Sequence, residues 1–198
     1  MTRSSRTRFR LLPYRMLAKR WRTPSVLLII AGLFLWWWGG IVAPNEMSEL
    51  PIQPPTGPLA LIIAIVGGLI LIYTLLANRA NIQCQSNRLV IHVPLAIIAV
   101  SYARVILTRP VEFRSIFPPE EERSARFRIY RSLYGKTVPV VDLKGYPLPP
   151  WWLRLWLHPF LLHPTETALV VPVEEWMTFT RTLDSLRTQW RENRRQSS

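Results

Sequence analysis

The sequence has one cysteine, Cys84, and none of the short motifs that mark a catalytic or nucleotide-binding site. One thiol excludes an internal disulfide, and there is no cysteine cluster that could hold a structural zinc or an iron–sulfur centre. Gly-rich phosphate loops, a Ser-centred nucleophile elbow and a Walker pattern are also missing. His158 and His163 have no cysteine or carboxylate at ligand spacing. We therefore expect no catalytic residue, no cofactor and no metal ion.

Acidic residues are missing from residues 1–24, although eight cations fall there: Arg3, Arg6, Arg8, Arg10, Arg15, Lys19, Arg20 and Arg22. A net charge of +13 could serve nucleic-acid binding, because cations that neutralise phosphates release counterions. The cations stand directly before a long apolar run, however, and positive charge beside a membrane span is a topology signal. The sequence therefore predicts a basic segment over 1–24 and no nucleic-acid partner.

Two long runs contain no charged residue, 25–42 and 59–77. About 20 apolar residues in a helix cross the ~30 Å hydrocarbon core of a bilayer. The connector between them, 43–58, carries five prolines and is typical of a short, stiff outer loop. The sequence therefore predicts a transmembrane helical hairpin over 25–78, with spans at about 25–42 and 59–77.

Basic residues flank the hairpin on both sides and are missing from the connector. By the positive-inside rule, both termini are expected in the cytoplasm of a multi-pass protein of the bacterial plasma (inner) membrane. Interface positions on the hairpin are predicted at Arg15, Lys19, Arg20, Arg22, Trp36, Trp37, Trp38 and Arg79. Ala60, Ala64 and Gly68 repeat at four-residue spacing, which permits close helix packing, although chance small residues explain the repeat equally well.

The remainder of the chain, 79–191, predicts a cytoplasmic α+β domain followed by a polar tail, 192–198. Alternating and β-branched residues predict a hairpin over 82–93, with further strands at 95–100, 105–107, 137–143 and 168–173. A helix is expected between Pro118 and Gly135, within a charged stretch, 110–136, that has the length of an insertion. The last helix shows one apolar stripe, formed by Trp176, Phe179, Leu183, Leu186 and Trp190.

A Trp- and Leu-rich run lies at 149–162, too short to span a membrane and interrupted by Pro159. Interfacial placement beside the hairpin and packing in the domain core are both consistent with this composition. We favour the interface, with Trp151, Trp152, Arg154 and Trp156 as its membrane-facing residues. In the strands, Cys84 is expected to be a buried thiol and His92 a surface histidine.

The order of these elements resembles the bacterial pleckstrin-homology-like domains, a family often attached to transmembrane helices. The resemblance is carried by residues 87–91, by 100–105 and by 168–173 leading into an amphipathic helix. It covers about residues 80–190 and implies a bent antiparallel β-sandwich closed by a C-terminal helix. Relatives that bind phosphoinositides carry several basic residues in the first hairpin loop, whereas this loop has only Arg88. A headgroup specificity is therefore not carried over.

The sequence thus predicts a membrane α-hairpin plus an α+β domain. Its expected function is that of a non-catalytic interaction or scaffold module at the inner face of the plasma membrane, binding a protein partner, an anionic lipid surface or both. The alternative is an accessory subunit of a larger membrane complex, in which the small-residue face and the Trp-rich run contact other subunits. An enzyme acting on lipids is the third hypothesis, and it lacks a recognisable polar site.

Overall fold

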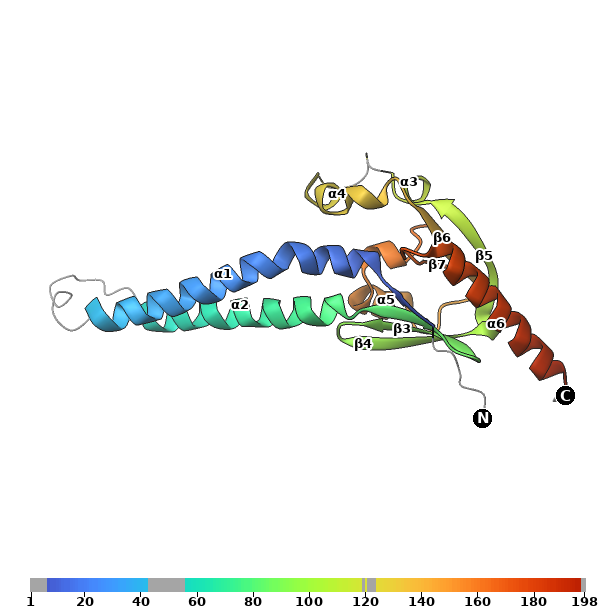
Figure 1. Cartoon of the computed structure of the whole chain (residues 1–198), viewed down its shortest axis with the longest axis horizontal. Coiled ribbons are helices and arrows are strands. Elements are labelled where there is room, and N and C mark those ends of the chain that lie inside the picture. The colour runs from blue at the N-terminus through green and yellow to red at the C-terminus, as the bar shows by residue number, and fades with distance from the viewer. Residues whose placement is uncertain (1–6, 43–55, 119, 121–123, 197–198) are drawn as a thin grey trace. The chain divides into compact units, whose positions relative to one another are not determined.

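The computed structural model describes residues 7–42, 56–118, 120 and 124–196. The chain divides into two units, residues 1–16 with 76–198 and residues 17–75. The boundary falls inside two long helices, α1 (Leu12–Val42) and α2 (Thr56–Asn78), so each helix contributes to both units. Figure 1 labels these elements along the chain.

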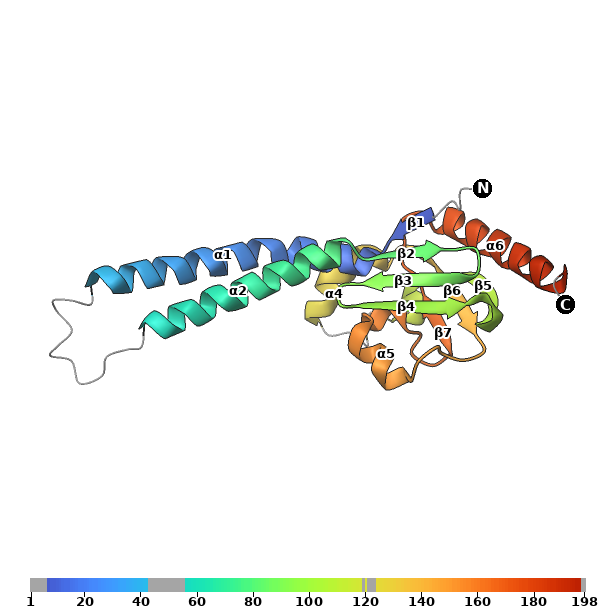
Figure 2. The ribbon, with the colours of Figure 1, turned by 90° about the horizontal axis from the view of Figure 1, so that it is seen from below.

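The first sheet of the larger unit has the order β1-β2-β3-β4, and all neighbouring strands are antiparallel. Its strands are β1 (Thr7–Arg10), β2 (Asn81–Cys84), β3 (Arg88–Val93) and β4 (Ala96–Ser101). Figure 2 shows β2, β3 and β4 side by side, with β1 at the edge beside β2. The predicted hairpin over 82–93 and the strand after it are confirmed.

Strand β1 was not predicted, because residues 1–24 were assigned to a basic segment outside the domain. The structure instead pairs Arg10 with Asn81 and Thr7 with Cys84, which adds the N-terminal segment to the sheet as its edge strand. Phe9 is 5% exposed, and the Leu11 that follows is 1% exposed. The sequence gives little indication of this strand, because it has only four residues and its partner strand is about 70 positions away.

The second sheet has the order β5-β6-β7 and is also antiparallel. Its strands are β5 (Val105–Glu112), β6 (Thr137–Leu143) and β7 (Ala168–Val170). The predicted strand over 137–143 is confirmed, β7 covers only the first half of the strand predicted over 168–173, and β5 is longer than expected. Between β5 and β6 the described chain forms α3 (Phe113–Ile116), α4 (Ser124–Tyr130) and η2 (Arg131–Leu133). Within the range of the helix expected between Pro118 and Gly135, α4 covers Ser124–Tyr130, and residues 119 and 121–123 lie outside the described residues.

The C-terminal helix α6 (Trp176–Gln196) contacts β2 of the first sheet and β6 of the second. The predicted apolar stripe is confirmed at its centre, where Phe179 and Leu183 are both 0% exposed. Trp176, Leu186 and Trp190 at the two ends of the stripe are half-buried. An aromatic cluster that includes Phe113, Tyr130 and Phe160 fills the space between the second sheet and the short helices. The larger unit is therefore an α+β domain with two antiparallel sheets.

In the smaller unit, α1 and α2 pack closely where Gly32 faces the second helix. A methyl group on Gly32 would lie 2.7 Å from the Ala64 nitrogen and 2.9 Å from the Ala60 oxygen. Ala60 and Ala64 thus lie at the contact, whereas Gly68 has open space and its neighbour Gly67 lies against α1 instead. Close approach of this kind requires residues without large side chains.

Within the described residues, one helix is long and apolar enough to cross a membrane, the 22 residues Gly57–Asn78 of α2. The predicted first span, 25–42, lies in α1, which begins at Leu12 and therefore extends well before the apolar run. Most of the predicted outer loop, 43–58, lies outside the described residues. The two-span hairpin accordingly stays a prediction.

Candidate binding groove

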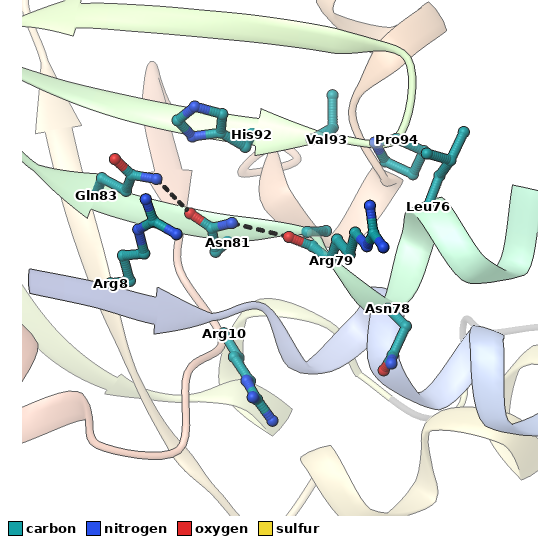
Figure 3. Close-up of a pocket in the computed structure, with 11 residues that line it drawn as sticks. Arg8, Arg10, Leu76, Asn78, Arg79, Asn81, Gln83, His92, Val93 and Pro94 are labelled. Atoms are coloured by element: carbon teal, nitrogen blue, oxygen red, sulfur yellow. Dashed lines mark hydrogen bonds between the residues drawn. The ribbon is translucent and has the colours of Figure 1, made fainter.

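A groove of about 780 Å³ opens on the larger unit beside the last turn of α2. Three strands, β1, β2 and β3, and the end of α2 form most of its wall, and Figure 3 shows how their side chains lie. We call this site the basic groove. It is lined by Arg8, Arg10, Leu76, Asn78, Arg79, Ala80, Asn81, Gln83, His92, Val93 and Pro94.

The strand period places these side chains on one face of the first sheet. Phe9 points into the core, so Arg8 and Arg10 on either side of it point outward, and both are exposed. The register sets Arg8 opposite Gln83 and Arg10 opposite Asn81. The same row continues to His92, which is opposite Asn81 on β3. The groove therefore lies on the outer face of the sheet.

Three arginines supply its charge, Arg8 and Arg10 from β1 and Arg79 from the turn that precedes β2. The lining contains no Asp or Glu. Among the described residues, none of the three guanidinium groups forms an ion pair with a carboxylate, in contrast to Arg15 and Arg109. Within the described part of the chain, no carboxylate therefore neutralises their positive charge.

Two amide side chains hold the turn that presents Arg79. Asn81 donates through Nδ2 to the Arg79 carbonyl oxygen over 2.8 Å. Gln83 in turn donates through Nε2 to the Asn81 Oδ1 over 2.9 Å, as the dashed lines in Figure 3 show. Gln83 is 6% exposed, so its bond to Asn81 is partly shielded from competing water, whereas the bond from Asn81 to Arg79 is exposed. The arrangement fixes the backbone beside the arginines in one position.

The pKa of His92 is lowered in this groove. Its burial and then the charge of Arg8 lower the pKa of its imidazole below the ordinary value of 6.5. Its Nδ1 is buried and has no hydrogen-bond partner among the described residues. His92 is half-buried on the outer face of the sheet, where it lines the groove. At neutral pH it is therefore an uncharged part of the groove wall.

Of the residues predicted for the membrane interface, Arg79 is the one that lines this groove. Arg15 is exposed and pairs with Glu174 over 2.8 Å. The other predicted interface residues of α1 are all exposed along that helix: Lys19, Arg20, Arg22, Trp36, Trp37 and Trp38. Sequence reasoning did not single out Arg8 or Arg10. The alternation Arg8-Phe9-Arg10 was the available signal, since it is the period of a strand with one buried face.

The Trp-rich run forms the short helix α5 (Pro150–Trp156) and the turn η3 (Pro159–Leu161). Pro150 suits the first turn, and the extended backbone at Leu157 before Pro159 ends the helix. Leu153 and Leu157 are buried at 0% and 3% exposure, whereas Trp151 and Leu155 are 69% and 68% exposed.

The helix α5 thus has both a core face and a free face. Trp152 and Trp156 are half-buried with their ring centroids 5.6 Å apart, and Arg154 is exposed.

A buried tyrosine joins α5 to the first turn of α1. Tyr14 is 2% exposed, and its hydroxyl donates to the Trp156 carbonyl oxygen over 3.3 Å. The same hydroxyl accepts from the His158 backbone N–H over 2.9 Å. The C-terminal end of α5 is therefore attached to the first turn of α1.

Cys84 lies in β2 at 0% exposure, and burial raises the pKa of its thiol to about 12. The described residues contain no group of three or more His, Cys, Asp or Glu side chains that could hold a metal ion. Comparison with protein-family models, with curated proteins and with solved structures found no match to this chain.

Proposed function

We propose that this chain is a membrane-anchored, non-catalytic binding module. In this proposal α1 and α2 form a transmembrane hairpin that holds the α+β domain at the inner face of the bacterial plasma membrane, with both termini in the cytoplasm. The domain is of the pleckstrin-homology-like kind and offers its surface to anionic lipid, to a protein partner or to both.

The observation that carries the proposal is the pairing of β1 with β2 on either side of the two helices. Arg10 pairs with Asn81, α1 begins at Leu12 and α2 ends at Asn78. The chain therefore leaves the domain and returns to it at adjacent positions of one sheet, as a hairpin anchor requires. If Gly57–Asn78 crosses the membrane, this edge of the domain lies at the membrane surface.

Two features near this edge suit a membrane surface. The basic groove adjoins the end of α2, and cations beside a cytoplasmic leaflet gain about 1 kcal/mol each from anionic lipid. The free face of α5 carries Trp151 and Leu155, and the C-terminal end of the same helix contacts Tyr14 of α1. Aromatic residues and arginine stems favour the level of the headgroups.

The resemblance to pleckstrin-homology-like domains is supported by the order of elements. In the described part of the chain, one sheet has four strands and the other three, both antiparallel and in sequence order, and a C-terminal helix contacts both. The proposed domain differs from the expected range, 79–191, because it also includes β1. On this view the helical hairpin is inserted between the first two strands.

Packing within the chain weakens the alternative of an accessory subunit. The small residues Ala60 and Ala64 contact Gly32 of the same chain, so their spacing needs no second protein to explain it.

Cysteine labelling of intact cells tests the anchor. In a Cys84→Ser background, Ser48→Cys in the connector should react with a membrane-impermeant maleimide, whereas Ser86→Cys in the exposed β2–β3 turn should react only after the cells are opened. Reaction at position 86 in intact cells, or protection at position 48, would contradict the proposed topology.

A further inference from the structure

We propose that the basic groove binds the phosphate-bearing headgroup of an anionic membrane phospholipid, with Arg8, Arg10 and Arg79 as the residues that contact the phosphate. This inference rests on the proposed function, because it requires the groove to lie at the membrane surface. It assigns the ligand class and the contacting residues, which the proposed function leaves open.

The first argument is charge. Three arginines line one groove whose lining has no carboxylate, and none of them has an ion-pair partner among the described residues. Guanidinium groups bind phosphate oxygens in a bidentate manner, and charge-assisted hydrogen bonds of this kind are among the strongest that proteins make. The amide network of Asn81 and Gln83 fixes the turn before β2 and reduces the conformational freedom lost on binding.

The second argument is depth. Asn78 is the last residue of the helix segment able to cross a membrane, and it also lines the groove together with Leu76. A residue at the end of a span lies where hydrocarbon gives way to headgroups. Arg79 directly follows Asn78 and Arg10 lies opposite Asn81, so in the proposed topology these two arginines stand close to the level at which lipid phosphates occur.

The third argument distinguishes a lipid from a free phosphate ion. In Figure 3, Leu76, Val93 and Pro94 gather at one end of the groove, and Arg8 lies toward the other. Next to them in the chain, Leu95 is 63% exposed and Ile97 is 68% exposed. A phosphate ion uses no apolar wall, whereas the glycerol and upper acyl chains of a phospholipid would contact one.

Lipid retention by the full chain tests the inference. The purified protein in a neutral detergent is titrated with phosphatidylglycerol, and native mass spectrometry measures the bound fraction. Phosphatidylcholine and water-soluble glycerol phosphate are the two comparison ligands. The test variant is Arg8→Gln/Arg10→Gln/Arg79→Gln. The control variant, Arg114→Gln/Arg128→Gln/Arg181→Gln, removes the same charge from exposed arginines outside the groove lining.

We expect the groove variant to bind phosphatidylglycerol about tenfold or more weakly than the wild type, and the control variant to stay within about threefold. Phosphatidylglycerol should be retained better than phosphatidylcholine, and glycerol phosphate at equal concentration should not displace it. Because all six arginines substituted in the two variants are exposed, both variants should melt like the wild type. The single variant Arg79→Gln, which lies outside the strands, gives a second measurement if the triple variant does not fold.

If the groove and control variants retain phosphatidylglycerol equally, the headgroup site is refuted. An acidic protein segment would then be the remaining candidate ligand of the groove. Displacement by glycerol phosphate would instead show a site for a soluble anion. Both outcomes are compatible with the labelling pattern expected of the anchored module, so neither would contradict the proposed function. Labelling at position 86 in intact cells would refute the anchor whatever the lipid result.

Discussion

Phe9 is the side chain through which the N-terminal strand packs against the C-terminal helix. Its ring lies edge-on to that of Phe179, with centroids 5.3 Å apart and an interplanar angle of 89°. Phe9 is 5% exposed and Phe179 is 0% exposed. Two residues further on, Leu11 bridges to Val173 after β7, so β1 and the residues after it join both sheets.

Replacing Phe9 by alanine should cost about 3–5 kcal/mol, the usual range for an aromatic side chain lost from a core. That is a large part of the roughly 5–15 kcal/mol that stabilises a typical domain. Each 1.36 kcal/mol changes an equilibrium constant about tenfold. The population in which β1 has separated from the sheet should therefore rise by about 150-fold to 5000-fold in Phe9→Ala.

Cys84 provides the assay, because it lies opposite Thr7 on the neighbouring strand and is fully buried. Its raised pKa and its burial keep the thiol unreactive until the sheet opens. Alkylation of the full chain in detergent micelles, followed by mass spectrometry, then reports opening. The control Ile97→Ala removes a side chain that is 68% exposed and should change the rate by less than about threefold. A Phe9→Ala protein alkylated as slowly as this control would refute the packing of β1 into the domain.

Three other outcomes are expected for the full chain. Leu183→Ala should destabilise the protein by about 2–5 kcal/mol, because Leu183 is 0% exposed, and an unchanged thermal melt would contradict the role of α6 in closing the domain. Below about pH 6.5 the melting temperature should rise with pH, since the lowered pKa of His92 means that the unfolded chain binds more protons there than the folded one. His92→Gln should reduce that slope, and a variant with the full slope would exclude this histidine as a cause. A spin label at position 151 in vesicles should be reached more by oxygen and less by an aqueous nickel reagent than one at Ser86, since Trp151 is 69% exposed on the free face of α5. Equal access would place α5 in water.

Local patterns predicted the elements that are long or strongly periodic. The hairpin over 82–93, the strand over 137–143 and helix α6 follow from alternation and from a helical stripe, which depend only on residues close in the chain. The two uncharged runs predicted long helices for the same reason, and α1 and α2 contain them. The length and composition of α2 are those of a membrane span, whereas the span in α1 stays a prediction.

The candidate site could not be found in this way, because its residues come from both sides of the helical hairpin. Arg8 and Arg10 looked like part of a basic tail until the register with Asn81 and Gln83 placed them on a sheet. The predicted packing residues show the same limit. Ala60 and Ala64 lie at the contact with Gly32, whereas Gly67, and not Gly68, meets α1. Spacing marks one stripe on a helix, but the rotation of a partner helix decides which small residues are used.

Composition and periodicity by themselves determined that this protein separates apolar helices from a basic α+β domain, because both patterns depend only on residues that are close together in the chain. The tertiary structure alone decided that the N-terminal segment belongs to that domain. Four residues of β1 carry too little signal to predict a strand, and β1 forms only when β2 and Phe179 offer hydrogen bonds and an apolar surface. It likewise decided that Trp151 is exposed while Leu153 is buried, since both residue types suit a core and only the orientation of α5 in the folded domain distinguishes them.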